Sequence, residues 1–269
     1  METKVHVWHT GSVRIDQSLA FQEKTLHPMP YSGWLRGRKK KRWVPVSVYL
    51  IEHPKGDVLV DTGWHEDIRT HQRRHLGLLS HSMFQGDLPL GQSVGERLRE
   101  QGKDLNSLHT VVLTHMHADH VSGLKHVEKA RRIIVSEEEW KAAHKEIGYR
   151  KSMWEGVAVD PLPLEVIPYG PFCKGIDLFN DGTVYLVHTP GHSRGQWSVL
   201  VQTVKGWVLL ASDVGYAVKS WEEGHLPGLM VDHEAAVASL DWVKTFSKRE
   251  DCYAVLANHD ADVREGRLV

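Results

Sequence analysis

The run Thr114 to His120, which reads THMHADH, constrains this chain more than any other segment. It contains three histidines and one aspartate, and it follows an apolar stretch at 110–114 that predicts a short strand. A tight turn after a strand can aim alternate side chains at one point, and imidazole and carboxylate groups suit zinc, iron, manganese or cobalt. The alternative is a histidine-rich surface loop, which the preceding apolar strand disfavours. We therefore predict a metal centre that begins with His115, His117, Asp119 and His120.

Four side chains do not complete two metal sites, so further ligands must come from elsewhere in the chain. Three later residues that can bind metal each follow a hydrophobic stretch, where a scaffold can hold a side chain rigidly. These candidates are His192 after 183–188, Asp213 after 208–211 and His259 after 254–257. Any one of them alone would be interpreted as an ordinary loop residue, and their shared position beyond strand ends supports the prediction.

The composition excludes several classes of protein. The chain has 269 residues, 41% of them hydrophobic, and a formal net charge of -1, so neither nucleic acid nor an anionic membrane is an expected partner. Two distant cysteines, Cys173 and Cys252, favour a reducing compartment over a disulfide framework. No apolar stretch is long enough for a membrane span. We expect one cytoplasmic domain over residues 1–269, and the oligomeric state stays open, with a homodimer as one option.

Strands and helices are mixed along the chain. We expect strands at 44–51, 57–61, 110–114, 132–135, 183–188, 196–203, 207–211 and 253–257, and helices at 93–101, 137–147 and 233–246. Ser93 and Glu96 have the spacing of a capping box, and Ser136 is placed to cap the second helix. Turn residues at 180–182 and 205–206 indicate hairpins. Hairpins together with strand–helix alternation favour an α/β fold with helices packed outside two sheets.

The order of these motifs resembles the metallo-β-lactamase superfamily. Besides THMHADH, the chain has Val-Asp-Thr-Gly at 60–63, Thr-Pro-Gly-His at 189–192, Ala-Ser-Asp at 211–213 and Asn-His-Asp at 258–260. The resemblance implies an αββα sandwich of two mixed sheets flanked by helices, with the site at one edge. It assigns one metal ion, most simply zinc, to His115, His117 and His192, and a second to Asp119, His120 and His259. Asp213 would bridge both ions, and Asp61 would hold the histidine loop.

Within this superfamily the segment 212–216 resembles the N-acyl-homoserine lactonases, which have a tyrosine three residues after the bridging aspartate. The chain departs from them at Asn258, where glycine is more usual, and at 213–215, where they have a run of small residues. The resemblance implies that a hydroxide bridging the metals opens the lactone ring of these quorum-sensing signals. Tyr216 would stabilise the oxyanion, and Asp119 would carry the proton to the leaving alkoxide.

Other functions remain as alternatives at this stage. Asp213 takes the place of a cysteine needed by some class B β-lactamases, and His117 the place of an acidic residue in flavodiiron-type proteins, so both are disfavoured. A thioesterase of the glyoxalase II type, a phosphodiesterase or nuclease, and a non-catalytic binding module stay open. The run Arg36 to Arg42 is strongly basic, and we interpret it as a solvated loop.

Two further motifs invite a different interpretation. Gly191 to Gly195 matches GxSxG, the nucleophile elbow of serine hydrolases, but the residues that follow predict a strand instead of the required helix. The stretch 64–92 is rich in histidine without a clear period, and we interpret it as a loop or lid, not a third metal site. Five apolar residues there could line an acyl pocket or simply pack in the core: Leu76, Leu78, Leu79, Met83 and Phe84.

Overall fold

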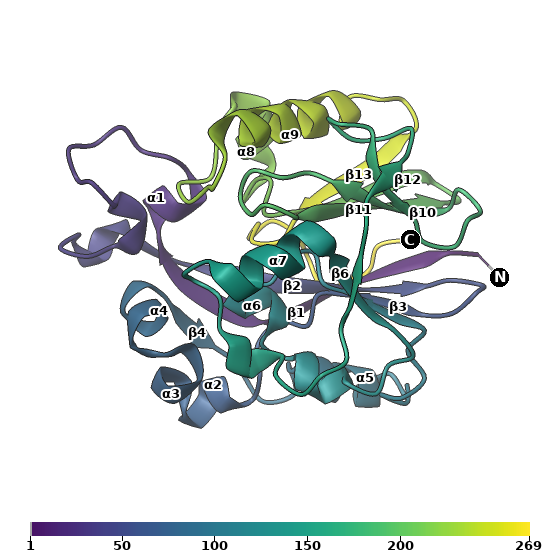
Figure 1. Cartoon of the computed structure of the whole chain (residues 1–269), viewed down its shortest axis with the longest axis horizontal. Coiled ribbons are helices and arrows are strands. Elements are labelled where there is room, and N and C mark those ends of the chain that lie inside the picture. The colour runs from purple at the N-terminus through teal and green to yellow at the C-terminus, as the bar shows by residue number, and fades with distance from the viewer. Residues whose placement is uncertain (1) are drawn as a thin grey trace.

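The computed structural model describes residues 2–269 and contains two β-sheets that pack face to face, with helices on their outer faces (Figure 1). The first sheet is antiparallel at one side and parallel at the other, and β4 (Gln85–Asp87) pairs with its longest strand. Across this sheet the strand order is β14 (Gly266–Arg267), β1 (Lys4–Asp16), β2 (Lys41–Glu52), β3 (Val58–Val60), β5 (Thr110–Val112), β6 (Ile133–Ser136) and β7 (Asp160–Leu162).

The second sheet is antiparallel except at one edge, where the two strands that come last in the sequence run parallel to each other. Its order is β13 (Cys252–Ala257), β12 (Gly206–Ser212), β11 (Trp197–Thr203), β10 (Val184–His188), β9 (Lys174–Asp177) and β8 (Glu165–Val166). Both hairpins expected from turn residues are present, between β9 and β10 and between β11 and β12.

The helices in the first half of the chain are short, and a longer helix lies in the second half. The α-helices are α1 (Gln17–Ala20), α2 (Asp67–Thr70), α3 (Gln72–Leu76), α4 (Leu78–Met83), α5 (Val94–Glu100), α6 (Ala118–Val121), α7 (Glu137–Lys145), α8 (Val218–Glu223) and α9 (His233–Phe246). The 3-10 helices are η1 (Pro30–Ser32), η2 (Arg38–Lys40), η3 (Leu124–Val127) and η4 (Lys151–Met153). Ser93 forms the predicted capping box with Glu96, and Ser136 caps α7 as expected.

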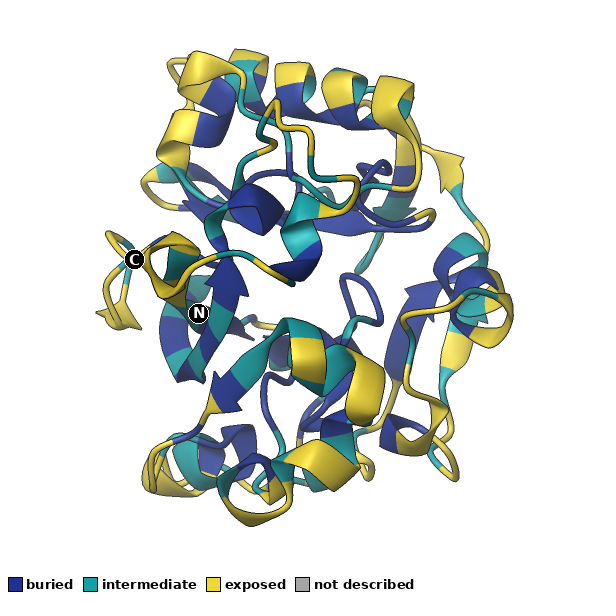
Figure 2. Cartoon of the chain, turned by 90° about the vertical axis from the view of Figure 1, so that its left-hand side faces the viewer, coloured by how far each residue is buried: buried dark blue, intermediate teal, exposed yellow. Residues whose placement is uncertain are grey.

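Alternation of side chains along the strands divides the core into layers. In β2, Tyr49 and Ile51 face the second sheet, whereas Val48 and Leu50 pack under the outer helices. In the second sheet a third cluster lies between the strands and helices α8 and α9. Figure 2 shows the same division, with exposed residues along the outward faces of the helices and buried residues on the strands. This is the predicted αββα sandwich.

The structure differs from the sequence prediction mainly in the first ninety residues. The long strand β1 was not predicted, because Gly11 sits at a bulge that shifts its register against β2. The stretch 64–92, expected to be a loop or lid, contains three short helices and β4. The basic run contains η2 and enters β2, and its Arg36 is not solvated but pairs with Asp16 and Glu23.

Across residues 2–269 none of the helices combines the length and the hydropathy needed to cross a lipid bilayer. Both thiols are free, with Cys173 exposed and Cys252 partly buried.

Candidate metal centre

Four strands deliver the candidate ligands to one edge of the sandwich. Strands β10 and β12 are both antiparallel to β11, and β13 is parallel to β12, so the C-terminal ends of all three meet at the same edge. His192, Asp213 and His259 follow these ends. Strand β5 of the other sheet leads into the THMHADH turn, where α6 begins after His117. The topology therefore brings together all seven residues predicted from the sequence.

Asp213 lies at the centre of the cluster. Its carboxylate oxygens are 3.4 Å from Nε2 of His120, 3.4 Å from Nε2 of His259 and 3.6 Å from Nε2 of His192. A carboxylate oxygen of Asp119 also lies 3.4 Å from Nε2 of His259. Donor atoms of neighbouring ligands around one ion are spaced in this way, whereas a direct imidazole–carboxylate hydrogen bond is shorter.

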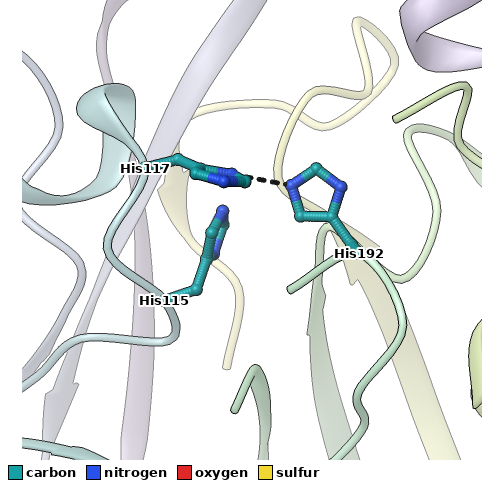
Figure 3. A group of neighbouring side chains, drawn as sticks. All are labelled: His115, His117 and His192. Carbon is teal, nitrogen blue, oxygen red and sulfur yellow. Dashed lines mark hydrogen bonds between the residues drawn. The ribbon is translucent and has the colours of Figure 1, made fainter. Parts of the chain in front are cut away.

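The donor atoms form two groups that share Asp213 between them. One group contains His115, His117 and His192, and the other contains Asp119, His120 and His259. Figure 3 shows the first group, in which two histidines of one loop point toward the histidine of another. A third triad, His115, His120 and Asp213, links the two groups. This division is the same as the one the family resemblance implies.

Three of the histidines are oriented by a hydrogen bond at the ring nitrogen that points away from the cluster. Nδ1 of His192 lies 2.9 Å from the carbonyl oxygen of Leu229, and Nδ1 of His259 lies 2.7 Å from that of Pro45. Nδ1 of His120 lies 2.8 Å from the carboxylate of Asp61. Each Nδ1–H donates to a fixed acceptor, so in the neutral ring the Nε2 lone pair is directed into the cluster, where Nε2 of His192 lies 2.9 Å from Nδ1 of His117. Metal-binding histidines are held in this way.

The residues present fit a pair of divalent ions. Buried nitrogen or oxygen atoms of His115, His120 and Asp213 lack a hydrogen-bond partner within residues 2–269, although such atoms are normally paired. Burial lowers the pKa of His115 and His117 well below its usual value, so both imidazoles are neutral at pH 7, as ligands must be. At His120 and His259 the nearby carboxylates outweigh burial and raise the pKa, so metal binding there would release a proton. Imidazole and carboxylate donors without thiolate suit zinc, iron, manganese or cobalt.

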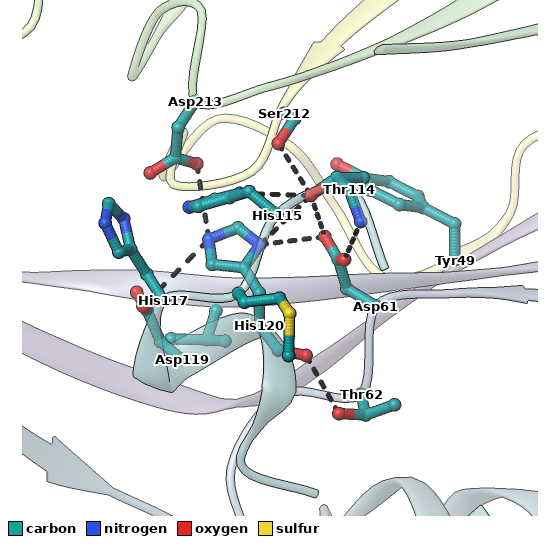
Figure 4. A network of polar contacts seen from close by, with 12 residues as sticks. Tyr49, Asp61, Thr62, Thr114, His115, His117, Asp119, His120, Ser212 and Asp213 are labelled. Atoms are coloured by element: carbon teal, nitrogen blue, oxygen red, sulfur yellow. Dashed lines mark hydrogen bonds and ion pairs between the residues drawn. The ribbon is translucent and has the colours of Figure 1, made fainter. Parts of the chain in front are cut away.

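Asp61 anchors the turn that carries the first ligands (Figure 4). Its carboxylate accepts hydrogen bonds from the backbone nitrogen and the hydroxyl of Thr114, both at 2.8 Å, in addition to the bond from His120. The Ser212 hydroxyl donates to the Thr114 hydroxyl at 2.9 Å and joins the two sheets. Asp61 and Ser212 both have positive φ angles, 60° and 52°, and such strain in non-glycine residues clusters at functional sites.

Glu139 is a buried residue that the sequence analysis did not single out. Its carboxylate accepts hydrogen bonds from the backbone nitrogen of Met116 at 3.0 Å and from that of Gly195 at 3.1 Å. Met116 lies between the candidate ligands His115 and His117, and Gly195 lies in the loop that contains His192. The Tyr149 hydroxyl donates a third hydrogen bond at 3.0 Å. Glu139 therefore joins two ligand loops that are far apart in the sequence.

A cavity of about 150 Å³ opens onto the cluster. Tyr216 lies in its wall, 5% exposed, with its ring stacked on His259 at 4.9 Å. Burial, together with the carboxylates of Asp213 and Asp119, raises the pKa of Tyr216 well above its usual value. Tyr216 is therefore a hydrogen-bond donor at neutral pH. Most of the lining is apolar and includes Val13, Ile15, Leu19, Leu79, Met83, Phe84, Ile147, Leu229 and Val231.

Several other residues that the sequence singled out lie elsewhere. Ser193 is fully buried, its hydroxyl has no partner within residues 2–269, and strand β11 follows it where a nucleophile elbow needs a helix. The serine-hydrolase alternative therefore has no structural support. Of the five apolar residues proposed for an acyl pocket, three line the cavity, whereas Leu76 packs in the core and Leu78 is exposed.

Comparison with known proteins decides the family. The model of the metallo-beta-lactamase superfamily matches residues 42–247, which include six of the seven candidate ligands. The chain belongs to this superfamily. An N-acyl homoserine lactonase AttM of Rhizobium radiobacter is 27% identical to this chain over 227 residues, covering 81% of this chain and 83% of the relative. An N-acyl homoserine lactonase of Bacillus cereus is 28% identical over 224 residues, covering 83% and 84%.

Solved structures support the metallo-beta-lactamase fold over nearly the whole chain. An N-acyl homoserine lactone hydrolase with the product N-hexanoyl-L-homoserine at its catalytic metal centre has a TM-score of 0.79 at 24% identity, covering 97% of this chain and 95% of that one. AidC, a dizinc quorum-quenching lactonase, has a TM-score of 0.66 at 12% identity, covering 97% and 88%. At these identities the likeness shows the fold.

Proposed function

We propose that this protein is a dinuclear metal-dependent hydrolase that opens the lactone ring of N-acyl homoserine lactones and so quenches quorum-sensing signals. The observation that carries the proposal is the apolar cavity, which ends at the histidine–aspartate cluster and has a tyrosine hydroxyl in its wall. An acyl chain fits the apolar part, and a lactone carbonyl fits the polar end. The lactonase relatives support the same substrate class.

Seven side chains would hold the two ions. His115, His117 and His192 would bind one, Asp119, His120 and His259 the other, and Asp213 would lie between them. When bound, the two ions supply an activated water as nucleophile and an electrophilic contact for the carbonyl oxygen. Zinc suits this donor set best, and iron, manganese and cobalt are compatible with it.

Two residues of the chain would act on the substrate directly. The Tyr216 hydroxyl keeps its proton at neutral pH and donates a hydrogen bond to the oxygen on which negative charge develops. Asp119 lies on the cavity wall as well as in the cluster, so its carboxylate can take a proton and deliver it to the leaving alkoxide. The reaction needs no covalent bond between substrate and protein.

The lining of the cavity favours a small neutral substrate. The two ions could bind one phosphate group, but a nucleic-acid strand has many phosphates, and the cavity-lining residues in the described chain, 2–269, include neither lysine nor arginine to contact them. We therefore propose a small neutral lactone as the partner and do not expect nucleic acid. We also propose that residues 1–269 act as one hydrolase domain, and the exposed free thiol of Cys173 is compatible with a cytoplasmic location.

The proposal is tested by an assay of the metal-reconstituted protein on three substrate classes. Acyl-homoserine lactones of several chain lengths are compared with thioesters of the glyoxalase II type and with phosphodiesters. We expect turnover of the lactones and an increase in kcat/KM as apolar carbons are added to the acyl chain. Turnover limited to thioesters or phosphodiesters would refute the lactonase and leave the metal centre intact.

A further inference from the structure

A second group of side chains of the types that can bind metal lies outside the candidate metal centre. The Asp67 carboxylate at the start of α2 lies between two imidazoles, with its Oδ2 atom 3.6 Å from Nδ1 of His65 and 3.5 Å from Nδ1 of His75. One donor atom from each of the three residues lies within 4.8 Å of the others. We propose that His65, Asp67 and His75 bind a third divalent metal ion, with zinc as the best-suited metal. This proposal reverses the interpretation from the sequence, which placed no third metal site in the stretch 64–92.

The distances are those of ligands around an ion and longer than those of a hydrogen bond. Donors that are about 2.0–2.2 Å from a tetrahedral ion lie roughly 3.3–3.6 Å from one another. This chain provides both references: Asp61 hydrogen-bonds His120 at 2.8 Å, whereas Asp213 lies 3.4 Å from His120 in the candidate metal centre. The distances at Asp67 match the second reference.

His75 is oriented as a metal ligand. Its Nε2 atom lies 2.7 Å from the Ser122 hydroxyl oxygen, which also accepts a hydrogen bond from the backbone nitrogen of His65 at 2.9 Å. In the tautomer with the proton on Nε2, the Ser122 hydroxyl accepts that hydrogen bond and the lone pair of Nδ1 is directed toward Asp67. The second imidazole nitrogen is thus held as it is in the candidate metal centre.

Other features make this site weaker than the candidate metal centre. Nδ1 of His65 accepts a hydrogen bond from the backbone nitrogen of Asp67 at 3.1 Å, which an ion must displace. Three cations, Arg74, Lys125 and Arg150, line the same cavity of about 470 Å³ and repel a cation. The cavity has room for a water molecule as the fourth ligand. We expect the third ion to dissociate first when free metal is lowered.

The third ion would connect the substrate cavity to the candidate metal centre. Ser122 directly follows α6, the helix that contains Asp119 and His120. On the other side, α3 leads into α4, from which Leu79 and Met83 reach the cavity wall. An ion at Asp67 would join these two segments and hold that wall in place.

Metal analysis of the full-length protein tests the third site directly. Wild type and variants are equilibrated in zinc buffers of stepped free concentration and analysed for zinc per chain, with a thermal melt to check folding. We expect His75→Ala and Asp67→Asn to bind one ion fewer than wild type at high free zinc. His71→Ala is the matched control, because His71 lines the same cavity outside the triad, and we expect wild-type binding from it.

The outcomes separate this proposal from the proposed function. Equal zinc content in wild type, His75→Ala and Asp67→Asn at every free concentration would overturn the third site. Loss of one ion in these variants supports the third site whether or not the lactone is a substrate. If the wild-type protein binds the third ion but does not hydrolyse lactones, only the proposed function is refuted.

Discussion

Glu139 accepts a hydrogen bond from the backbone nitrogen of Met116 at 3.0 Å, and this contact fixes the residue between two candidate metal ligands. The other oxygen of the same carboxylate holds Gly195, in the loop of His192. The three histidines of the first metal group therefore depend on one buried carboxylate for their relative position. Glu139 is a positioning residue, since it contacts neither the donor atoms nor the cavity.

Glu139→Gln should weaken metal binding more than it weakens the fold. The amide replaces one acceptor oxygen with a donor that faces an N–H group, which costs about 1–3 kcal/mol of folding stability. We expect zinc affinity to fall about 10- to 100-fold, as it does when an orienting partner is lost. The absorption spectrum of the cobalt-substituted protein should also change. Glu137→Gln is the matched control, because Glu137 pairs with Lys141 at the surface.

A purely structural role for Glu139 would give a different result. The variant would then melt at a lower temperature, while its zinc affinity and cobalt spectrum stayed like those of wild type.

Tyr216→Phe should lower turnover and leave metal content unchanged. The hydroxyl is the proposed donor to the oxyanion, and removing one such donor costs about 100-fold in kcat. The phenylalanine ring keeps the stacking on His259. The measurement is kcat on an acyl-homoserine lactone beside zinc per chain. Wild-type kcat in the variant would remove Tyr216 from the mechanism.

Ser193→Ala should retain activity and fold at least as well as wild type. The hydroxyl is buried without a hydrogen-bond partner within residues 2–269, so the alanine removes an unpaired polar group and stabilises the protein by up to about 1 kcal/mol. Urea unfolding and a lactone assay measure the two effects. Complete loss of activity with intact metal content would instead indicate that Ser193 is the nucleophile.

Much of the fold follows from local patterns in the sequence. Helix α9 was predicted with its observed bounds, and the strands that precede the candidate ligands were predicted within a few residues. The hydrophobic runs of β5 and β12 are buried, so the local pattern and the tertiary structure agree there, whereas β13 is partly exposed.

Features that depend on distant contacts could not be predicted. Glu139 stands in a run of three glutamates, and only packing between two remote loops distinguishes it from Glu137. The sequences of the short helices α2 to α4 show no helical hydrophobic period. Tertiary contacts hold these helices in place. Asp67 and His75 are eight positions apart, so only the turn between α2 and α3 brings them together.

His188 should make the protein sensitive to acid. Burial, followed by the charge of Lys174, lowers the pKa of His188 to about 4 from 6.5. Between these values the unfolded chain binds the proton and the folded chain does not, so the free energy of unfolding falls as pH drops from about 6.5 to about 4. The loss amounts to about 2 kcal/mol at about pH 5.

His188→Gln isolates this effect, since every other titrating group stays in place. Urea unfolding of wild type and variant is compared at about pH 8 and about pH 5. We expect the variant to gain about 2 kcal/mol relative to wild type at the lower pH. An equal response of both proteins to acid would show that His188 is not the sensitive group.

Seven side chains from both sheets would hold the proposed pair of ions. A crystal structure of the zinc-loaded protein, with anomalous difference maps across the zinc absorption edge, tests this arrangement most directly. We predict two adjacent peaks roughly 3.5–4 Å apart. One should be bound by His115, His117 and His192, the other by Asp119, His120 and His259, with Asp213 touching both. A single peak, or maps in which His192, Asp213 and His259 turn away from the ions, would contradict the account.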